Sequence, residues 1–333
     1  VKDKDLFASE MGFKEALSGV YSLMTKEGLY GKELTFGWLG VLGQEWTSVP
    51  YNYEDDQKYD FENAASEVRI DSVWTGLYNA IANANKLLKE LEGKENLFSG
   101  DNYSIIKGEV LALRAYLQFD LLRIFGASCA VGMERIAIPY VTEYAPTIFP
   151  QEKVGDFVGK VLKDLQDAAK CLENDPILTG RTVSEIDDNG YLMNRQVHLN
   201  YYAVKGLMAR VYLYKGDYAN AEVCAKEVIG SGCFEWVKQE NLTNESVADL
   251  TFSTEHLFAL NIVTLGNIVD KYLDGGNNSF ALEESRLSEY YGSSYDYRYL
   301  YLFKTGVGMS NTLRYLKKYD QLESVSWAQS YRN

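Results

Sequence analysis

The sequence predicts a mainly α-helical protein whose helices pair and stack into a solenoid, together with an irregular, loop-rich lobe that contains a few short strands. Three observations predict this fold. Apolar residues recur at helical spacing through most of residues 70–230, one stretch there has the small-residue spacing of a helical repeat, and residues 28–66 and 233–333 lack both patterns. The 333 residues are 46% hydrophobic, which is enough to bury a large core.

The first predicted element is an amphipathic helix over residues 6–27, in which Phe13, Leu17 and Met24 share one face. Residues 28–66 then lose the helical period, because glycines and Pro50 interrupt a stretch rich in aromatic and acidic residues. We expect a long loop here, with one short helix around residues 38–46. Loops of this length in a compact protein are commonly functional or mobile.

The helical period then returns, and Trp74 and Ile81 belong to an apolar stripe that predicts a helix over residues 70–91. Asp71 or Ser72 is placed to cap its start.

The next predicted helix, residues 108–125, is apolar on nearly every side and must therefore be buried. Its charged residues are expected to pair inside or beside the core, and they are Glu109, Arg114, Asp120 and Arg123. For Arg114 in particular we expect a buried position and a carboxylate partner. A left-handed glycine cap at Gly126 is expected to end the helix.

A short extended segment is predicted at residues 136–141, before Pro146 and Pro150. Residues 154–172 carry the cleanest amphipathic stripe in the chain and predict a further helix. A polar, glycine-containing segment, residues 173–196, follows it.

Residues 199–214 and 218–230 are predicted to be the two antiparallel helices of a tetratricopeptide-like repeat. Small residues such as Ala209 and Ala221 let the helices approach, and Gly216-Asp217-Tyr218 makes the turn between them. The helix at residues 108–125 fits the first helix of a degenerate repeat whose partner is 154–172. Since such repeats cannot bury their apolar faces alone, adjacent pairs must stack.

Beyond Gly232 the sequence changes character. Residues 254–262 are predicted to form a strand. The remainder alternates glycine and asparagine turns with a tyrosine-dense segment at residues 290–301.

Charge and composition exclude several classes of function. Lys and Arg total 33 against 47 Asp and Glu, and the net charge of −14 repels phosphate backbones and anionic membrane surfaces, so nucleic acid is not an expected partner. No apolar run reaches the roughly 20 residues that span a bilayer. The 4 cysteines show no metal-ligand spacing, so we expect free, mostly buried thiols.

Residues 108–126 read G-E-x-x-A-L-R-A-Y-x-x-F-D-L-x-R-x-F-G. This wording closely resembles the signature helix of the RagB/SusD family, the surface nutrient-binding lipoproteins of Bacteroidota. Further matches follow in the family's order, at residues 73–85, 138–140, 164–168, 203–232, 255–259 and 317–320. The resemblance therefore covers about residues 6–333.

The resemblance implies a lipoprotein at the cell surface that sits on a SusC-like, TonB-dependent outer-membrane transporter. It captures oligosaccharides, or in some members peptides, for import and is not an enzyme. The implied fold is a single SusD-like domain over residues 1–333. Its helical repeat core spans about residues 67–232, and its loop-rich lobe comes from about 28–66 and 233–333.

Two features depart from the family's pattern. The lipidated N-terminal cysteine is absent, so contact with the membrane is expected only through an anchor that this chain lacks. Family members usually continue after a Lys-Tyr-Asp segment with a further helix and a last repeat pair, whereas this chain stops at Asn333. Either the C-terminal portion is missing here or this is a short member.

Motifs for catalysis are not found. His198 and His256 are the only histidines, and we expect no catalytic residue, cofactor or metal. Residues 187–190 and 55–56 contain acidic residues that could bind calcium but lack the spacing of a calcium loop, which favours solvated acidic turns. Glu283-Glu284 has the residue types of a glycosidase pair, but among 47 acids such a pair is uninformative. His198 is expected to cap or pack.

The ligand site is expected in the lobe, because loops supply variable contacts on a rigid frame. Aromatic planes can hold flat sugar faces while amides and carboxylates bind the hydroxyl groups. The first candidate region holds Trp46, Tyr51, Asn52 and Tyr53. The second holds Tyr290, Tyr291, Tyr295, Asp296, Tyr297 and Arg298.

The alternative for each ring is that it fills the core of the lobe or meets the transporter. If the assignment is right, alanine at Trp46 and Tyr291 weakens ligand binding and leaves the melting temperature nearly unchanged.

Two other functions stay open from the residues alone. One is an intracellular tetratricopeptide-type scaffold that binds protein partners, which a gene beginning with a lipoprotein signal and cysteine would exclude. The other is a helical glycoside hydrolase, which release of reducing sugar from glycans would reveal.

Overall fold

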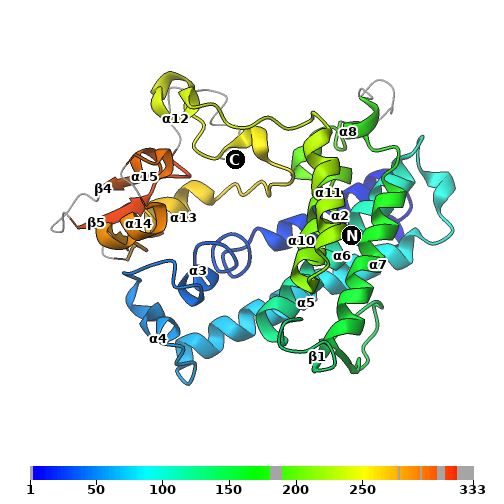
Figure 1. The fold of residues 1–333 in the computed structure, drawn as a ribbon. Helices are drawn as coiled ribbons and strands as arrows, with labels where there is room; N and C mark the ends of the chain where they lie inside the picture. The colour runs from blue at the N-terminus through cyan, green and yellow to red at the C-terminus, as the bar shows by residue number, and fades with distance from the viewer. Residues whose placement is uncertain (1–2, 181–189, 277, 293–294, 306–311, 321–333) are drawn as a thin grey trace. The chain divides into compact units, whose positions relative to one another are not determined.

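The structure is a computed structural model, and it describes residues 3–180, 190–276, 278–292, 295–305 and 312–320. Its contacts divide the chain into two compact units (Figure 1). The helical unit consists of Val1–Leu23, Trp74–Phe234 and His256–Leu260. The irregular unit consists of Met24–Val73, Glu235–Glu255 and Asn261–Asn333. The assignment of one domain to residues 1–333 stays a prediction.

The first predicted helix is two helices, α1 (Asp3–Leu6) and α2 (Glu10–Met24). The interruption has a local cause, because the Ser9 hydroxyl accepts a hydrogen bond from the amide of Gly12 (3.3 Å) and so caps a new helix start. Gly12 is needed there, since a Cβ atom would lie 1.6 Å from the carbonyl oxygen of Leu6.

Helix α5 (Ala64–Leu91) contains the predicted helix but begins earlier, so the expected caps Asp71 and Ser72 lie inside it. Asn63 is the cap, because its side-chain oxygen accepts hydrogen bonds from the amides of Ala65 (3.1 Å) and Ser66 (3.0 Å). The 3-10 turn η2 (Glu95–Leu97) follows α5.

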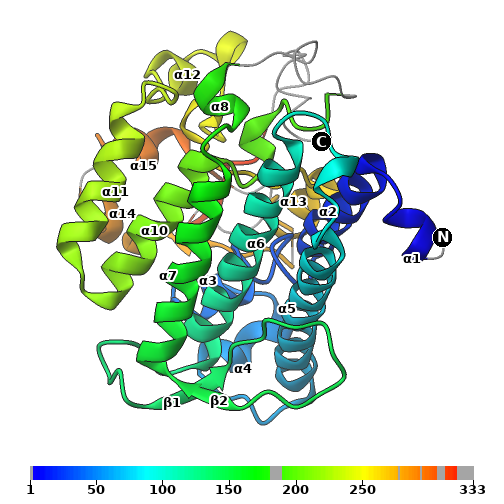
Figure 2. The same cartoon turned by 90° about the vertical axis from the view of Figure 1, so that its right-hand side faces the viewer.

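Helix α6 (Asn102–Phe125) is buried on nearly every side, as predicted. It packs along α7 (Val154–Cys171), and Figure 2 shows the two helices side by side. Gly108 allows this approach, because a Cβ atom there would lie 2.7 Å from the side chain of Leu172 and 3.0 Å from Cys171. The prediction of a left-handed cap at Gly126 was wrong, since its φ is −100°. Glycine is required for space, as its Cβ would lie 2.6 Å from Leu122.

The extended segment after α6 is confirmed as β1 (Ile136–Pro139), which pairs antiparallel with β2 (Gln151–Lys153). Two short elements follow before the last pair of helices. They are α8 (Pro176–Thr179) and the 3-10 turn η3 (Arg195–Val197).

The repeat is confirmed as α10 (Tyr201–Lys215) and α11 (Tyr218–Gly230), which pack on each other while α10 also packs on α7. Gly216 ends α10 with a φ of +85°, a conformation that favours glycine. The Asp217 side chain then caps α11 by accepting a hydrogen bond from the amide of Asn220 (3.2 Å). Helices α6, α7, α10 and α11 therefore stack in sequence, as a solenoid does.

The predicted strand at residues 254–262 was wrong. The segment contains the end of the 3-10 turn η5 (Ser253–Glu255) and is otherwise irregular. Most of its side chains are intermediate in burial, whereas those of a strand would alternate between buried and exposed. Its backbone groups make single hydrogen bonds to separate segments of the chain. The amide of Ala259 donates to the carbonyl of Gln196 (2.8 Å), and the carbonyl of Leu257 accepts from the Asn200 side chain (2.8 Å). These bonds replace a strand ladder.

Charged groups of α6 pair inside the helical unit, as predicted. Arg114 donates two hydrogen bonds to the carboxylate of Asp164, both 2.7 Å long, and its side chain is 12% exposed. The hydroxyl of Tyr140 donates a further bond to Asp164 (2.5 Å). Asp120 and Arg123 pair with each other at 2.7 Å.

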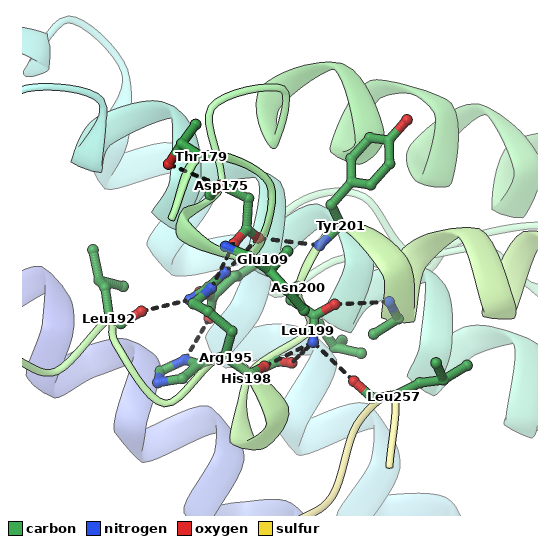
Figure 3. A network of polar contacts seen from close by, with 12 residues as sticks. Glu109, Asp175, Thr179, Leu192, Arg195, His198, Leu199, Asn200, Tyr201 and Leu257 are labelled. Carbon is green, nitrogen blue, oxygen red and sulfur yellow. Dashed lines mark hydrogen bonds and ion pairs between the residues drawn. The ribbon is translucent and has the colours of Figure 1, made fainter. Parts of the chain in front are cut away.

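Glu109 lies in a second, buried network (Figure 3). Its carboxylate accepts hydrogen bonds from Arg195 (2.6 Å) and Tyr21 (2.8 Å), and it lies 2.8 Å from the Nδ1 atom of His198. Arg195 also donates two bonds of 2.8 Å to Asp175. The network joins α2, α6 and the segments before α10, and His198 lies in it between Glu109 and the carbonyl oxygen of Tyr191, 2.8 Å from each.

The irregular unit contains short elements around an aromatic core. Its helices and 3-10 turns are α3 (Trp38–Leu42), η1 (Tyr51–Tyr53), α4 (Glu54–Gln57), α12 (Glu240–Thr243), η4 (Glu245–Val247), α13 (Leu265–Tyr272), α14 (Glu284–Tyr291) and α15 (Tyr297–Tyr301). The strands β3 (Leu282–Glu283), β4 (Phe303–Thr305) and β5 (Leu313–Leu316) form an antiparallel sheet in the order β3-β5-β4.

The 4 cysteines are free thiols. Cys224 is buried, Cys129 and Cys171 are half-buried and Cys233 is exposed, so they are less buried than predicted. Among the described residues, no helix is long and apolar enough to span a membrane.

Candidate functional site

Two predicted site residues of the first aromatic region belong to the core of the irregular unit. Trp46 is 5% exposed and Tyr53 is 1% exposed. Both rings pack against Phe280, with centroids 5.8 Å and 5.0 Å away respectively. The Trp46 indole donates to the carbonyl of Phe36 (2.7 Å), and the Tyr53 hydroxyl donates to Glu33 (2.7 Å). The alternative stated above, that rings fill the core, therefore holds for these two.

The other two residues of this region lie at the surface. Tyr51 is 86% exposed at the start of η1. Asn52 is exposed too, and its backbone carbonyl accepts a hydrogen bond from Arg69 (3.0 Å).

The second aromatic region forms a cluster on α14 and α15. Arg298 lies over the ring of Tyr291, 4.9 Å from its centroid, and pairs with Asp296 at 2.7 Å. The hydrogen bonds from Arg298 lower the pKa of Asp296 to about 2, so this carboxylate stays ionised. Tyr297 stacks on Tyr301, with centroids 5.9 Å apart and planes inclined by 16°. Tyr295 is 86% exposed.

Tyr290 and Tyr59, a residue that the sequence did not single out, each bind a backbone carbonyl of the same turn. The hydroxyl of Tyr290 donates to the carbonyl of Gln44 (2.9 Å), and the hydroxyl of Tyr59 donates to the carbonyl of Leu42 (2.9 Å). The two acceptors lie two residues apart in one turn. Tyr290 nevertheless stays 49% exposed and Tyr59 54% exposed. We call Tyr59 and Tyr290 the aromatic platform.

The turn whose carbonyls bind the aromatic platform contains backbone strain and is held by side-chain hydrogen bonds. Gln44 and Tyr59 have φ values of 55° and 59°, in the left-handed region that non-glycine residues rarely adopt. The Gln44 amide donates to the carbonyl of Gln57 (2.9 Å), and the Gln57 amide donates to the carbonyl of Trp46 (2.9 Å). Strain of this kind is held only where the surroundings fix it, and it concentrates at functional sites.

Polar side chains lie close to Tyr290 or next in sequence to Gln44. The guanidinium of Arg286 lies 5.8 Å from the centroid of Tyr290. Glu45 follows Gln44 in the turn, and partial burial raises the pKa of its carboxyl group. Fixed aromatic planes beside amide, carboxyl and guanidinium groups can hold a flat polar molecule by its apolar face and bind its hydroxyl groups.

A buried charge cluster supports the same unit. Arg69 pairs with Asp56 and lies over the ring of Tyr53, 3.9 Å from its centroid. Lys32 pairs with Glu33 at 3.1 Å. Burial alone would lower the pKa of Lys32, but the negative charge of Glu33 outweighs this effect and raises it above its usual value.

Asp56 and Glu284 are both held by neighbouring side chains. Asp56 was expected in a solvated turn, but it is fully buried because Arg69 and the Trp38 indole (3.0 Å) bind its carboxylate. Residues 187–189 lie outside the described residues. Glu284, weighed as half of a glycosidase pair, is bound by Arg314 (2.7 Å) and Tyr299 (3.1 Å). Within the described ranges, no group of three or more His, Cys, Asp or Glu is arranged to hold a metal ion.

Comparisons with known proteins agree on a fold. A family profile, SusD-like, described as starch-binding and associating with the outer membrane, matches residues 2–213. A putative sugar-binding protein from Bacteroides vulgatus is similar, with 22% identity and a TM-score of 0.70 over 97% of this chain and 70% of that one. A SusD superfamily protein from Bacteroides thetaiotaomicron has 19% identity and a TM-score of 0.69 over 98% of this chain and 72% of that one. No curated protein sequence matches.

Proposed function

The chain belongs to the SusD-like family, and from this premise we propose that it captures oligosaccharides at the cell surface and delivers them to a TonB-dependent outer-membrane transporter. The proposal is for binding without catalysis. The family's description as starch-binding and associating with the outer membrane supports the ligand class and the place. A SusC-like transporter as partner and an N-terminal lipid anchor are parts of the same proposal.

The observation that carries the proposal is the aromatic platform. Ligand sites for flat polar molecules need exposed rings whose orientation is fixed in advance, because ordering a free side chain costs about 0.5–1.5 kcal/mol. Tyr59 and Tyr290 meet this need, since both hydroxyls are bound to backbone while half of each side chain is exposed. The cluster of Tyr291, Tyr297 and Arg298 offers further contacts on the same unit.

The test is direct binding of the protein to a panel of neutral and acidic oligosaccharides and of short peptides, measured by calorimetry. We expect binding of at least one oligosaccharide and no release of reducing sugar from it. Tight binding of peptides alone would show that the ligands are peptides and not oligosaccharides. Release of reducing sugar would show that the protein is a hydrolase and would contradict binding without catalysis. A gene start with a lipoprotein signal and cysteine would exclude an intracellular scaffold.

A further inference from the structure

A hollow of about 530 Å³ opens in the irregular unit at the start of α5. Sites for small molecules typically enclose about 300–1,000 Å³. Its lining residues come from three segments of the chain, residues 28–33, residue 52 and residues 64–72. Neither the aromatic platform nor the Tyr291 cluster includes any of them.

The walls of this hollow combine small apolar groups with hydrogen-bonding groups. Ala64, Ala65 and Val68 are exposed on the first turns of α5, and Val68 is 69% exposed. The hydroxyl of Ser72 lies on the same helix, facing Gly28. A Cβ atom at Gly28 would lie 3.0 Å from that hydroxyl oxygen, so glycine keeps the wall open beside it.

Arg69 forms the floor, and its guanidinium has donors to spare. Its side chain is 7% exposed, and among the described residues it donates to Asp56 and to the carbonyl of Asn52 (3.0 Å). Its Nε atom lies 3.7 Å from Glu33, which is too long for a hydrogen bond. A guanidinium carries five N–H donors, and these two hydrogen bonds do not use all of them. An oxygen-rich ligand in the hollow would supply the acceptors.

The charges around the hollow indicate a neutral ligand. The positive charge of Arg69 is matched by Asp56, and that of Lys32 by Glu33, whose carboxylate also lies in the wall of the hollow. An anionic ligand beside Arg69 would thus meet a carboxylate at the same wall. The whole chain, at −14, adds no attraction for anions.

We propose that this hollow is a subsite that receives an uncharged sugar residue of the captured glycan, with adjacent hydroxyl groups bound by the Arg69 guanidinium and the Asn52 amide. The inference rests on the proposed function and specifies its ligand as a neutral glycan. Ala64, Ala65 and Val68 contact the apolar C–H face of the sugar.

The test uses two variants of exposed α5 residues that lie two positions apart and point to different sides of the helix. Ala65→Trp fills the hollow, whereas Glu67→Trp places the same ring on the same helix outside the hollow and serves as the control. Asn52→Ala removes the amide but keeps the backbone carbonyl that binds Arg69. Affinities for maltoheptaose, cellohexaose, xylohexaose and hexagalacturonate are measured by calorimetry, and melting temperatures check the fold.

We expect the wild type to bind a neutral probe and to bind hexagalacturonate more weakly. For that neutral probe, Ala65→Trp should lose at least tenfold in affinity, Asn52→Ala severalfold, and Glu67→Trp should bind as the wild type does. Wild-type affinity in Ala65→Trp, or preferred binding of hexagalacturonate, overturns the inference. If Ala65→Trp binds normally while alanine at both Tyr59 and Tyr290 removes binding, the subsite falls and the proposed function stands. If the wild type binds no carbohydrate, both fall.

Discussion

Arg114 shows how a single buried charge is accommodated in the helical unit. Two of its donors bind Asp164, which Tyr140 also binds, and a third reaches the side chain of Asn85 (3.1 Å). The sequence alone predicted a carboxylate partner, because a guanidinium in an apolar helix must be paired. It did not identify Asp164, since the partner depends on which face of α7 meets α6.

Replacing Arg114 by alanine should leave Asp164 buried without its cation. Breaking a buried ion pair from one side costs about 3–5 kcal/mol, and we expect a loss of that size in the free energy of unfolding. Urea denaturation of wild type and Arg114→Ala measures it. Lys163→Ala, which removes an exposed pair with Asp167, is the control and should change stability little. A loss below about 1 kcal/mol for Arg114→Ala would contradict this account.

Trp46 shows what the sequence could not settle. Its place in an aromatic loop is compatible with a ligand contact or a core position, and its packing on Phe280, far away in the chain, places it in the core. The same holds for Tyr53. Tyr59 carried no pattern that marked it, because its role comes from a hydroxyl contact across the turn.

The melting temperature of Trp46→Ala should therefore fall, contrary to the expectation from sequence that it stays unchanged. Truncating a buried tryptophan costs about 3–5 kcal/mol. Tyr51→Ala, at an exposed aromatic residue of the same region, should melt as the wild type does. Thermal unfolding followed by circular dichroism tests the pair, and equal melting temperatures for the two variants would refute the core placement of Trp46.

At the scale of elements, the solenoid helices were predictable and the irregular elements were not. Helices α6, α7, α10 and α11 follow apolar periods that the burial of one face imposes. A strand was wrongly predicted for residues 254–262, because a run of apolar residues also occurs in irregular chain whose backbone makes isolated hydrogen bonds to neighbouring segments. The start of α5 was missed because Asn63 caps it ahead of the apolar stripe.

The Glu109 network that joins α2, α6 and the start of α10 should make stability depend on pH. Burial alone would raise the pKa of Glu109, but the charges of His198 and Arg195 outweigh burial and lower it from 4.5 to about 2. The unfolded chain therefore takes up a proton near pH 4.5 that the folded chain takes up only near pH 2. This contribution is complete above pH 4.5 and is lost as the pH falls from 4.5 towards 2.

The variant Glu109→Gln isolates this effect. It should be less stable at neutral pH by about 3–5 kcal/mol, because Arg195 loses an ionic partner. Between pH 4.5 and 2 its unfolding free energy should also depend less steeply on pH, by up to one proton. Urea midpoints measured across that range provide the comparison, and parallel curves for variant and wild type would show that Glu109 does not carry the acid sensitivity.

At the scale of the whole molecule, the family and the architecture followed from the sequence, whereas the candidate site did so only in part. The residue pattern of residues 108–126 indicated a SusD-like protein, and the family profile over residues 2–213 confirms this. The expectation that the site lies in the loop-rich lobe remains a proposal, since loop side chains are placed by contacts that no local period reveals. Of the predicted rings, Tyr290 is retained in the aromatic platform.

The central claim is that the platform binds glycan, and the most direct measurement is calorimetric binding of a neutral oligosaccharide to the double variant Tyr59→Ala/Tyr290→Ala. Taking about 1 kcal/mol for each ring as a guide from aromatic stacking, the double variant should bind at least about tenfold more weakly. Tyr59→Phe/Tyr290→Phe keeps the rings and should recover part of the affinity. Tyr218→Ala, exposed on α11 in the helical unit, is the control. Wild-type affinity in the folded double alanine variant would contradict the account.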